Sequence, residues 1–308
     1  MATTGPGILL EKPLVFTVLG IQFWDAATEQ PIADGLTVTA QLQGTGYPIV
    51  TAVRTASGAY AFQGLPCLHS IEYPDNSAPR VSPQPTFSFV ITVADSLGRF
   101  LPILFAVDLP LPYSGLFLSN NTVGSPPGTE ARAYLFSAPT RPSTTGIEVL
   151  RVSLWDHERG VPASYAAVQV SINGNQWIGI ADDEGRVQIQ FPSPLLQSLS
   201  LGSPPGSGQG GTSSVSWPVQ VTVLYEPSQL NFLLQGVPDV TWPWNAIPSL
   251  KSILDAQQSA LLWQQETGPP VPEWTGTLNY GTPLLLRTQL NDPTQTSPVL
   301  MISQSTSP

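Results

Sequence analysis

The stretch Phe23-Trp24-Asp25 is followed, six residues after the aspartate, by Pro31, and the same pattern returns as Leu154-Trp155-Asp156 with Pro162. In both places a hydrophobic run ends at an aromatic residue and an aspartate, a turn containing proline follows, and an alternating strand comes next. Alternation of apolar and polar residues is typical of a strand with one buried face. The chain therefore contains two copies of one β-rich module.

The match between the two copies extends beyond this corner. Each copy continues with an alternating strand, then with a turn that ends at a glycine, and then with a second alternating strand. The paired positions are Val38 and Ala40 with Val168 and Val170, and Gly58-Ala59-Tyr60-Ala61-Phe62 with Gly185-Arg186-Val187-Gln188-Ile189. This duplication predicts the architecture more directly than it predicts an activity.

A chain of 308 residues is long enough for two domains that each bury a core. It contains 33 prolines and 26 glycines, and these residues interrupt the sequence too often for long helices. About seven short strands per copy, separated by turns, are typical of a β-sandwich. We predict an all-β protein of two tandem β-sandwich domains with a short C-terminal helix.

Of two segments rich in proline, glycine, serine and threonine, the first indicates the domain boundary and the second an exposed loop inside the second domain. Residues 137–146 lie directly before the point where the repeat restarts at Ile147, and residues 202–211 delay a strand of the second copy. The predicted organisation is an N-terminal arm at 1–13, a first β-sandwich at 14–138, a linker at 139–146 and a second β-sandwich at 147–308, which includes a Gly/Pro-rich loop at 202–214 and a C-terminal appendix.

The appendix contains a segment with helical spacing, which starts after Ser249 and stops at Gly268-Pro269-Pro270. Its periodic apolar residues are Leu250, Ile253, Leu254, Leu261 and Leu262. We predict a helix over 249–265 that either covers its own core or docks on a neighbouring subunit. A last apolar run at 299–302 either completes its own sheet or adds a strand to a neighbour.

The chain carries few charges. Charged residues make up 10% of it and the formal net charge is −10, whereas an ordinary soluble domain has roughly 25% charged residues. Such a surface suits a subunit packed against others, or a neutral secreted-type β protein. Because there are 11 Lys and Arg residues and no basic cluster, binding to nucleic acid or to an anionic membrane is not expected. The expected partners are proteins or neutral ligands.

Signals for export are weak in this sequence. Residues 1–10 lack the basic start and the long apolar run of a signal peptide, and no stretch approaches the ~18 apolar residues of a membrane span. Cys67 is alone, so no intramolecular disulfide can form. We therefore expect a cytoplasmic protein without direct membrane insertion.

The residues that could do chemistry match no catalytic or metal-binding pattern. Cys67-Leu68-His69 offers two ligands where zinc needs three or four, and Asp156-His157-Glu158 has no nucleophile motif beside it. Asp182-Asp183-Glu184-Gly185 could form a calcium loop, but the first copy has Thr55-Ala56-Ser57-Gly58 there, so a turn explains both. We predict no catalytic, metal-binding or cofactor-binding residues.

Tryptophans are concentrated in the second half of the chain. Trp242-Pro243-Trp244 could form a platform on which sugars stack, although rings that fill cores or interfaces are more common. Because the appendix lies outside the repeated framework, we predict that it carries the protein interface. The predicted interface residues are Trp242, Trp244, Leu250, Leu254 and Trp263.

Each copy resembles a carboxypeptidase-regulatory-like, or transthyretin-like, module. The resemblance rests on the strand ending in an aromatic–Asp pair, the proline turn, the valine-rich strand and the Gly-x-(Tyr/Val)-x-(Phe/Ile) strand that finishes at Leu65-Pro66 or Phe191-Pro192. With residues 93–102, 135–142 and 181–187, nearly the whole chain is similar to a two-module protein found with phage-tail-like contractile injection systems.

This resemblance implies Ig-like or transthyretin-like sandwiches and a non-catalytic structural subunit or adaptor in the baseplate, fibre or cap region of such a particle. The implied partners are other protein subunits, including further copies of the same chain. The alternative function is a carbohydrate-binding or ligand-binding module of a surface protein.

Overall fold

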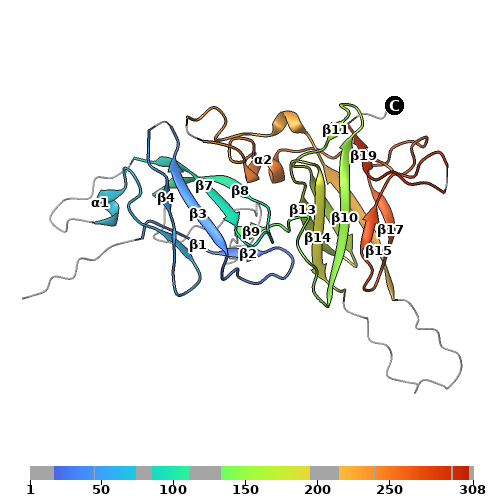
Figure 1. Cartoon of the computed structure of the whole chain (residues 1–308), viewed down its shortest axis with the longest axis horizontal. Coiled ribbons are helices and arrows are strands. Elements are labelled where there is room, and N and C mark those ends of the chain that lie inside the picture. Colours follow the sequence, from blue (N-terminus) through green and yellow to red (C-terminus); the bar gives the residue numbers. More distant parts are fainter. Residues whose placement is uncertain are drawn as a thin grey trace, which may run out of the picture.

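The computed structural model contains two β-sandwich modules, placed one after the other along the long axis (Figure 1). It describes residues 17–44, 46–73, 85–110, 133–194, 215–238, 240–292 and 294–304. The predicted arm at 1–13 and the loop at 202–214 lie outside these residues. We call the described residues up to 138 the first module and those from 147 onward the second module. The prediction of an all-β fold is confirmed.

The first module consists of three groups of strands: β1-β6-β5, β4-β3-β7-β8 and the pair β2-β9. Inward residues of β3 alternate with more exposed ones, as expected of a strand with one face on the core. The strands and the short helix are β1 (Leu19–Ile21), β2 (Phe23–Asp25), β3 (Leu36–Leu42), β4 (Val50–Thr51), β5 (Val53–Arg54), β6 (Tyr60–Phe62), α1 (His69–Glu72), β7 (Phe87–Asp95), β8 (Ile103–Leu109) and β9 (Ala133–Leu135).

The second module repeats this frame with longer strands. One sheet has the order β13-β12-β15-β17, and the other is built around β10, which pairs with β11, β14, β18 and β19. The elements are β10 (Ile147–Asp156), β11 (Val161–Pro162), β12 (Ala167–Ile172), β13 (Asn175–Ile180), β14 (Arg186–Pro192), β15 (Ser216–Leu224), the 3-10 turn η1 (Pro227–Gln229), α2 (Leu250–Asp255), β16 (Leu261–Trp263), β17 (Trp274–Asn279), β18 (Leu284–Leu286) and β19 (Leu300–Ser303).

The two aromatic–Asp corners have the same geometry. Trp24 is bridged to Pro31 in the first module and Trp155 is paired with Pro162 in the second. The last strand of each module then runs parallel to this corner, in the same register: Trp24 lies opposite Tyr134 of β9, and Trp155 lies opposite Met301 of β19. The run at 299–302 thus completes its own sheet.

The modules differ in what joins the third and fourth strands of one sheet. In the first module, β7 and β8 are joined by a tight turn at Asp95, whose carboxylate accepts hydrogen bonds from the backbone amide (2.7 Å) and Nε (3.1 Å) of Arg99. In the second module, the equivalent strands β15 and β17 are separated by residues 225–273. The predicted C-terminal appendix therefore begins as an insertion within the second sandwich.

The predicted helix over 249–265 is wrong in its extent. The helix α2 ends at Asp255, and Leu261 and Leu262 belong to strand β16, which pairs antiparallel with β19. The Ala-Leu-Leu-Trp run at 260–263 is fully apolar, so helical spacing could not distinguish it from a buried strand. Pairing with β19 decides the outcome, because it satisfies the backbone of both strands within the second core.

The linker at 139–146 is tied to both modules. The guanidinium of Arg141 binds both carboxylate oxygens of Asp25, at 2.9 and 2.6 Å, and lies 4.8 Å from the ring centre of Phe100. Its backbone carbonyl accepts a hydrogen bond of 2.6 Å from Nε2 of Gln188 in the second module. This contact accounts for the burial of a glutamine on β14.

Candidate functional site

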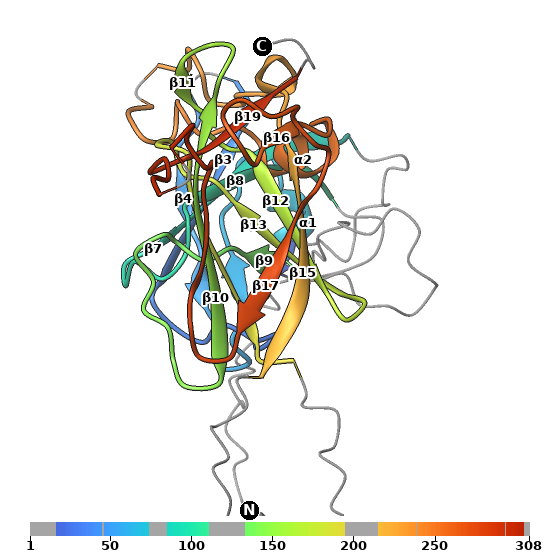
Figure 2. The same cartoon turned by 90° about the vertical axis from the view of Figure 1, so that its right-hand side faces the viewer.

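The junction between the two modules is the candidate functional site. Residues 226–257, which we call the strap, leave the second module after β15 and pass over the first module near β8 (Figure 1). In Figures 1 and 2, α2 lies in the upper part of the molecule, as β11 and β19 do, and Figure 1 shows it between the two modules. At Ser249 the strap bridges to Leu104 of β8 in parallel orientation. A segment of the second module therefore extends a sheet of the first.

The strap is held by internal hydrogen bonds around α2. The amide of Ser249 donates to the carbonyl of Asn231 (2.7 Å), and the hydroxyl of Ser252 accepts from the amide of Asn231 (3.0 Å). At the other end of the helix, Nε2 of Gln257 donates to the carbonyls of Ile253 (2.9 Å) and Tyr165 (2.8 Å). These bonds fix the helix relative to the second module.

Apolar packing fixes the strap to the first module. Leu234 and Ile247 form a small buried cluster with Val90 of β7 and Leu104 of β8. Trp244 packs against this cluster and is half-buried. The strap thus covers the face of β7 and β8 that points away from the core of the first module.

The helix α2 joins the two cores. Leu250 and Ile253 belong to the same buried cluster as Ile103 of the first module and Ile180 of the second. Burial of a Leu or Ile side chain contributes about 1.5 to 3 kcal/mol, so these two residues supply a substantial part of the association between modules. The strap therefore joins the modules through a continuous apolar contact.

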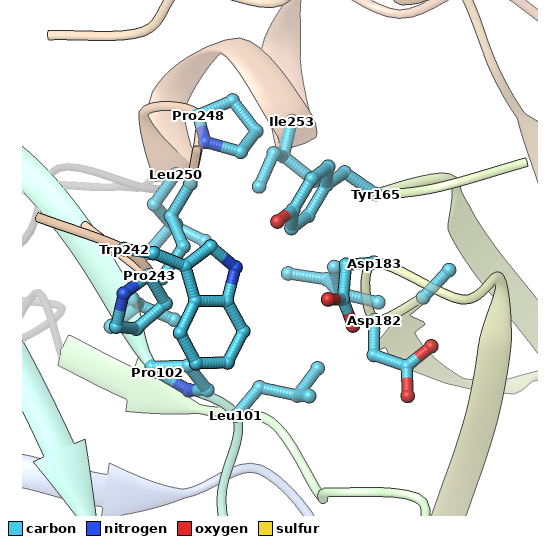
Figure 3. A pocket seen from close by; sticks show the side chains of 14 residues that line it. Leu101, Pro102, Tyr165, Asp182, Asp183, Trp242, Pro243, Pro248, Leu250 and Ile253 are labelled. Atoms are coloured by element: carbon cyan, nitrogen blue, oxygen red, sulfur yellow. The ribbon is translucent and has the colours of Figure 1, made fainter. Parts of the chain in front are cut away.

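A cavity of about 170 Å³ lies where the strap meets both modules (Figure 3). Its walls come from four segments of the chain: the start of β8, the turn around Tyr165, the turn around Asp182, and the strap. Most of the lining is apolar. The lining residues are Leu101, Pro102, Ile103, Tyr165, Ile180, Ala181, Asp182, Asp183, Trp242, Pro243, Ile247, Pro248, Leu250 and Ile253.

The charged groups that line the cavity are two aspartates. Asp182 is buried and its carboxylate accepts hydrogen bonds from Nε of Arg186 (2.9 Å) and from the amides of Glu184 (3.0 Å) and Arg186 (2.8 Å). Asp183 is exposed. Burial, followed by the charges of Asp183 and Asp182, raises the pKa of the Tyr165 hydroxyl to about 12. The Tyr165 hydroxyl is therefore a neutral donor at physiological pH.

The structure places the five predicted interface residues in different environments. Leu250 lies in the core between the modules, and Trp263 is buried in the second module, where Nε1 donates to Ser303 (3.1 Å). Leu254 is partly buried against the cluster that contains Leu250, and Trp244 is partly buried against the cluster of Leu234 and Ile247. Trp242 is 71% exposed. A contact with another subunit through these residues remains a prediction, and Trp242 is the one with a large free surface.

Other residues that could do chemistry have structural surroundings. The ring of His157 lies 5.2 Å from that of Trp263, and His69 stacks on Tyr73 at 4.7 Å. Asp156 accepts hydrogen bonds from the amides of Glu158 and Arg159, both at 3.0 Å, which is the turn role expected of it. Within the described residues, no group of three or more His, Cys, Asp and Glu side chains could hold a metal ion. Likewise, no helix in the described ranges is long and apolar enough to cross a membrane.

Sequence reasoning did not connect the residues that share the cavity. Trp242 was considered with Trp244 as a flat platform, and Asp182-Asp183 as a turn. The structure brings Trp242 and Asp183 together with Tyr165, although 59 or more residues separate Trp242 from the other two. No local pattern could reveal this, because the grouping depends on the strap folding back onto the junction.

Comparisons with known proteins give no family. No family model matches the chain, and no curated protein matches it. Solved structures found by shape include the Bacillus anthracis TIE protein (8% identity, TM-score 0.22, covering 93% of this chain and 34% of that one). Others are the shaft pilin SpaA from Lactobacillus rhamnosus GG (8%, 0.22, 93% and 97%) and BcpA, the major pilin subunit of Bacillus cereus (7%, 0.20, 89% and 59%). The chain spans about a third of the TIE protein, and at these TM-scores the likeness carries no argument about function.

Proposed function

We propose that the chain is a non-catalytic structural subunit or adaptor that holds other protein subunits in position within a larger assembly. The observation that carries this proposal is the strap, because it packs Leu250 and Ile253 of the second module into a cluster with Ile103 of the first. Two sandwiches joined in this way keep a fixed spacing between their outer surfaces. A fixed spacing is what a positioning subunit requires.

The contact surface that we favour is the corner segment at residues 47–54 of the first module. Here β4 ends one sheet and β5 ends another, so among the described strands both sheets have an open edge on this segment. Its apolar side chains are exposed: Tyr47 by 43%, Ile49 by 57% and Val53 by 65%. An open edge beside exposed apolar side chains is suited to pairing with a strand of another subunit.

We further propose that the assembly is a phage-tail-like contractile injection particle built in the cytoplasm, with this chain in its baseplate, fibre or cap region. The resemblance of the two modules and of residues 93–102, 135–142 and 181–187 supports this location. The low charge content also supports it, since four aspartates are already paired within their own turns or linker, with Arg141, Arg99, Arg159 and Arg186. Charged residues are only 10% of the chain, and the cores of interfaces are depleted of charge.

A second candidate function is a carbohydrate-binding or ligand-binding module. One observation favours it: Trp242 is 71% exposed and lies at a cavity instead of in a core. An aromatic ring held at the surface beside a cavity is a common element of ligand sites.

The test is a native pull-down of the tagged chain from its source cells, followed by electron microscopy and mass spectrometry. We expect sheath, tube or baseplate-like proteins to co-elute, and the double variant Ile49→Lys/Val53→Lys to lose them. Leu97→Lys is the matched control, because Leu97 is an equally exposed apolar residue (58%) on a different turn. Recovery of a monomer without partners would contradict the assembly proposal and leave the ligand-binding function.

A further inference from the structure

Two aromatic side chains, those of Trp242 and Tyr165, line the cavity at the junction. Trp242 lies on one side of it, and Tyr165, Asp182 and Asp183 lie on the other (Figure 3). The indole is exposed, but its backbone is anchored, because Trp244 packs two residues later into the buried cluster of Leu234 and Ile247. This packing keeps the indole of Trp242 beside the cavity.

The backbone of Tyr165, on the opposite side of the cavity, is restrained by hydrogen bonds. The residue has a φ of 60°, in the left-handed region that costs a non-glycine residue on the order of 1 kcal/mol. Its amide donates to the carbonyl of Asp182 (3.4 Å), and its carbonyl accepts from Gln257 of the strap (2.8 Å). The backbone of Tyr165, which carries the ring, is therefore held by both the second module and the strap.

The electrostatic character of the cavity is negative. Asp182 is compensated by Arg186, with a closest contact of 2.8 Å. Asp183 is exposed at the rim, and its backbone carbonyl accepts a hydrogen bond from Ser164 (2.6 Å). Among the residues that the structure describes, the lining contains no lysine, arginine or histidine. The charges of both aspartates act on Tyr165, since they contribute to the raised pKa of its hydroxyl.

The lining also argues against a sugar. The described part of the lining has no amide side chain and no Ser or Thr, so its side-chain polar atoms are those of Tyr165, Trp242 and the two aspartates. A hexose in such a cavity would leave several hydroxyls without partners, and each unpaired buried polar group is costly. The space of about 170 Å³ equals that of roughly six water molecules, which suits a small compact ligand.

We propose that this cavity binds a small organic cation of the quaternary ammonium type, with the indole of Trp242 and the ring of Tyr165 facing the cation and Asp183 supplying the counter-charge. Aromatic faces attract such cations, and the attraction grows when water is excluded. Apolar walls from Leu101, Ile103 and Ile253 take the methyl groups. Because the walls belong to both modules and the strap, the bound cation stabilises the junction. This inference does not depend on the proposed assembly.

The test compares choline with 3,3-dimethylbutan-1-ol, its neutral isostere of the same shape, by calorimetry and by quenching of tryptophan fluorescence. We expect saturable binding of choline that is about tenfold tighter than that of the neutral isostere. Added salt should weaken the binding of choline and leave that of the isostere unchanged, since Asp183 is exposed.

Two variants with matched controls locate the site. Trp242→Ala should abolish binding of choline, whereas Tyr73→Ala, which removes an aromatic ring of the first module that is 43% exposed, should not. Asp183→Asn should weaken the binding of choline several-fold. Glu184→Gln removes the same charge from the same turn, but Glu184 is not among the lining residues, so this variant should have a smaller effect. All four positions are exposed, so we expect melting temperatures close to that of the parent protein.

Three results would overturn the proposal. The first is equal affinity for choline and the neutral isostere, which would indicate an apolar pocket. The second is the absence of binding of either compound at millimolar concentration. The third is tighter binding of a methyl glycoside than of choline, which would transfer the site to the carbohydrate alternative.

Discussion

The two modules share a frame and differ in the connection between two strands of one sheet. In the first module, β7 turns directly into β8 through the tight turn at Asp95. In the second, the same connection is opened into residues 225–273, and part of this insertion packs on the first module. The common frame explains the fold, whereas the difference between the copies explains the junction, the cavity and the proposed role.

The corner aspartates give a second contrast between the modules. Asp25 and Asp156 occupy the same turn position and both are buried. Asp25 is bound by Arg141, which lies 116 residues further along the chain and is largely buried, whereas Asp156 is bound by Arg159 only three residues away, whose side chain is 45% exposed. The first module thus depends on the linker for an ion pair that the second module makes locally.

The largest expected effect follows from this contrast. Arg141→Ala removes the partner of a buried carboxylate and should lower the free energy of unfolding by about 3 to 5 kcal/mol. Arg159→Ala also leaves a buried carboxylate without its ion-pair partner, but this guanidinium is 45% exposed, so water can take its place and the loss should be smaller. Urea denaturation of both variants measures the difference, and equal losses would show that the linker does not support the first module in this way.

A smaller effect is expected at the glycines of the matching turns before β6 and β14. Gly58 and Gly185 have similar positive φ angles of 84° and 76°, but a Cβ at Gly185 would lie 2.5 Å from the carbonyl oxygen of Leu154, while at Gly58 it would meet nothing within 4 Å. Gly58→Ala should therefore cost about 1 kcal/mol and Gly185→Ala about 2 to 4 kcal/mol. Thermal unfolding of the two variants tests this, and a larger loss for Gly58→Ala would break the comparison.

The smallest effect concerns pH. Burial alone would raise the pKa of Asp25, but the hydrogen bonds and charge of Arg141 and the amide of Ala27 outweigh it, so the folded pKa is lowered. Burial is outweighed in the same way at Asp95, by Arg99. A lowered folded pKa gives stability that is fully present above the ordinary value near 4 and is lost as the pH falls through the folded pKa.

Urea denaturation between pH 7 and pH 2.5 measures this dependence. The double variant Asp25→Asn/Asp95→Asn should show a flatter decline below pH 4 than the parent chain. Asp292→Asn is the control, because the pKa of Asp292 is also lowered, by hydrogen bonds from Thr294, but the residue is fully exposed and its loss should matter less. An unchanged acid limb in the double variant would count against the role of these two aspartates.

Much of the frame was predictable because it is local. Short stretches of sequence determine the aromatic–Asp corners, the alternating strands and the turns ending at Gly58 and Gly185. Each of these stretches occurs in both copies of the repeat. The role of Asp182 as a turn residue followed from the same comparison. Each of these features depends on a few neighbouring residues, so pattern and composition suffice.

The junction was not predictable, because it depends on contacts between distant segments. Leu261 and Leu262 fit a helix by spacing, and only pairing with β19 makes them a strand. No sequence pattern around Leu250 indicates that its partners lie in the first module, and none around Arg141 indicates that it pairs with Asp25. The cavity shares this origin, since Trp242 and Tyr165 meet only after the strap has folded back.

The central claim is that the strap joins the two modules into one cooperative unit, and differential scanning calorimetry tests it most directly. The variant Ile253→Asp places a charge in the shared cluster, and Lys251→Asp, on the exposed side of the same helix, is its control. We predict a single transition with equal calorimetric and van't Hoff enthalpies for the parent chain and for Lys251→Asp, and two separate transitions for Ile253→Asp. Two transitions in the parent chain, or one unchanged transition in Ile253→Asp, would contradict the account.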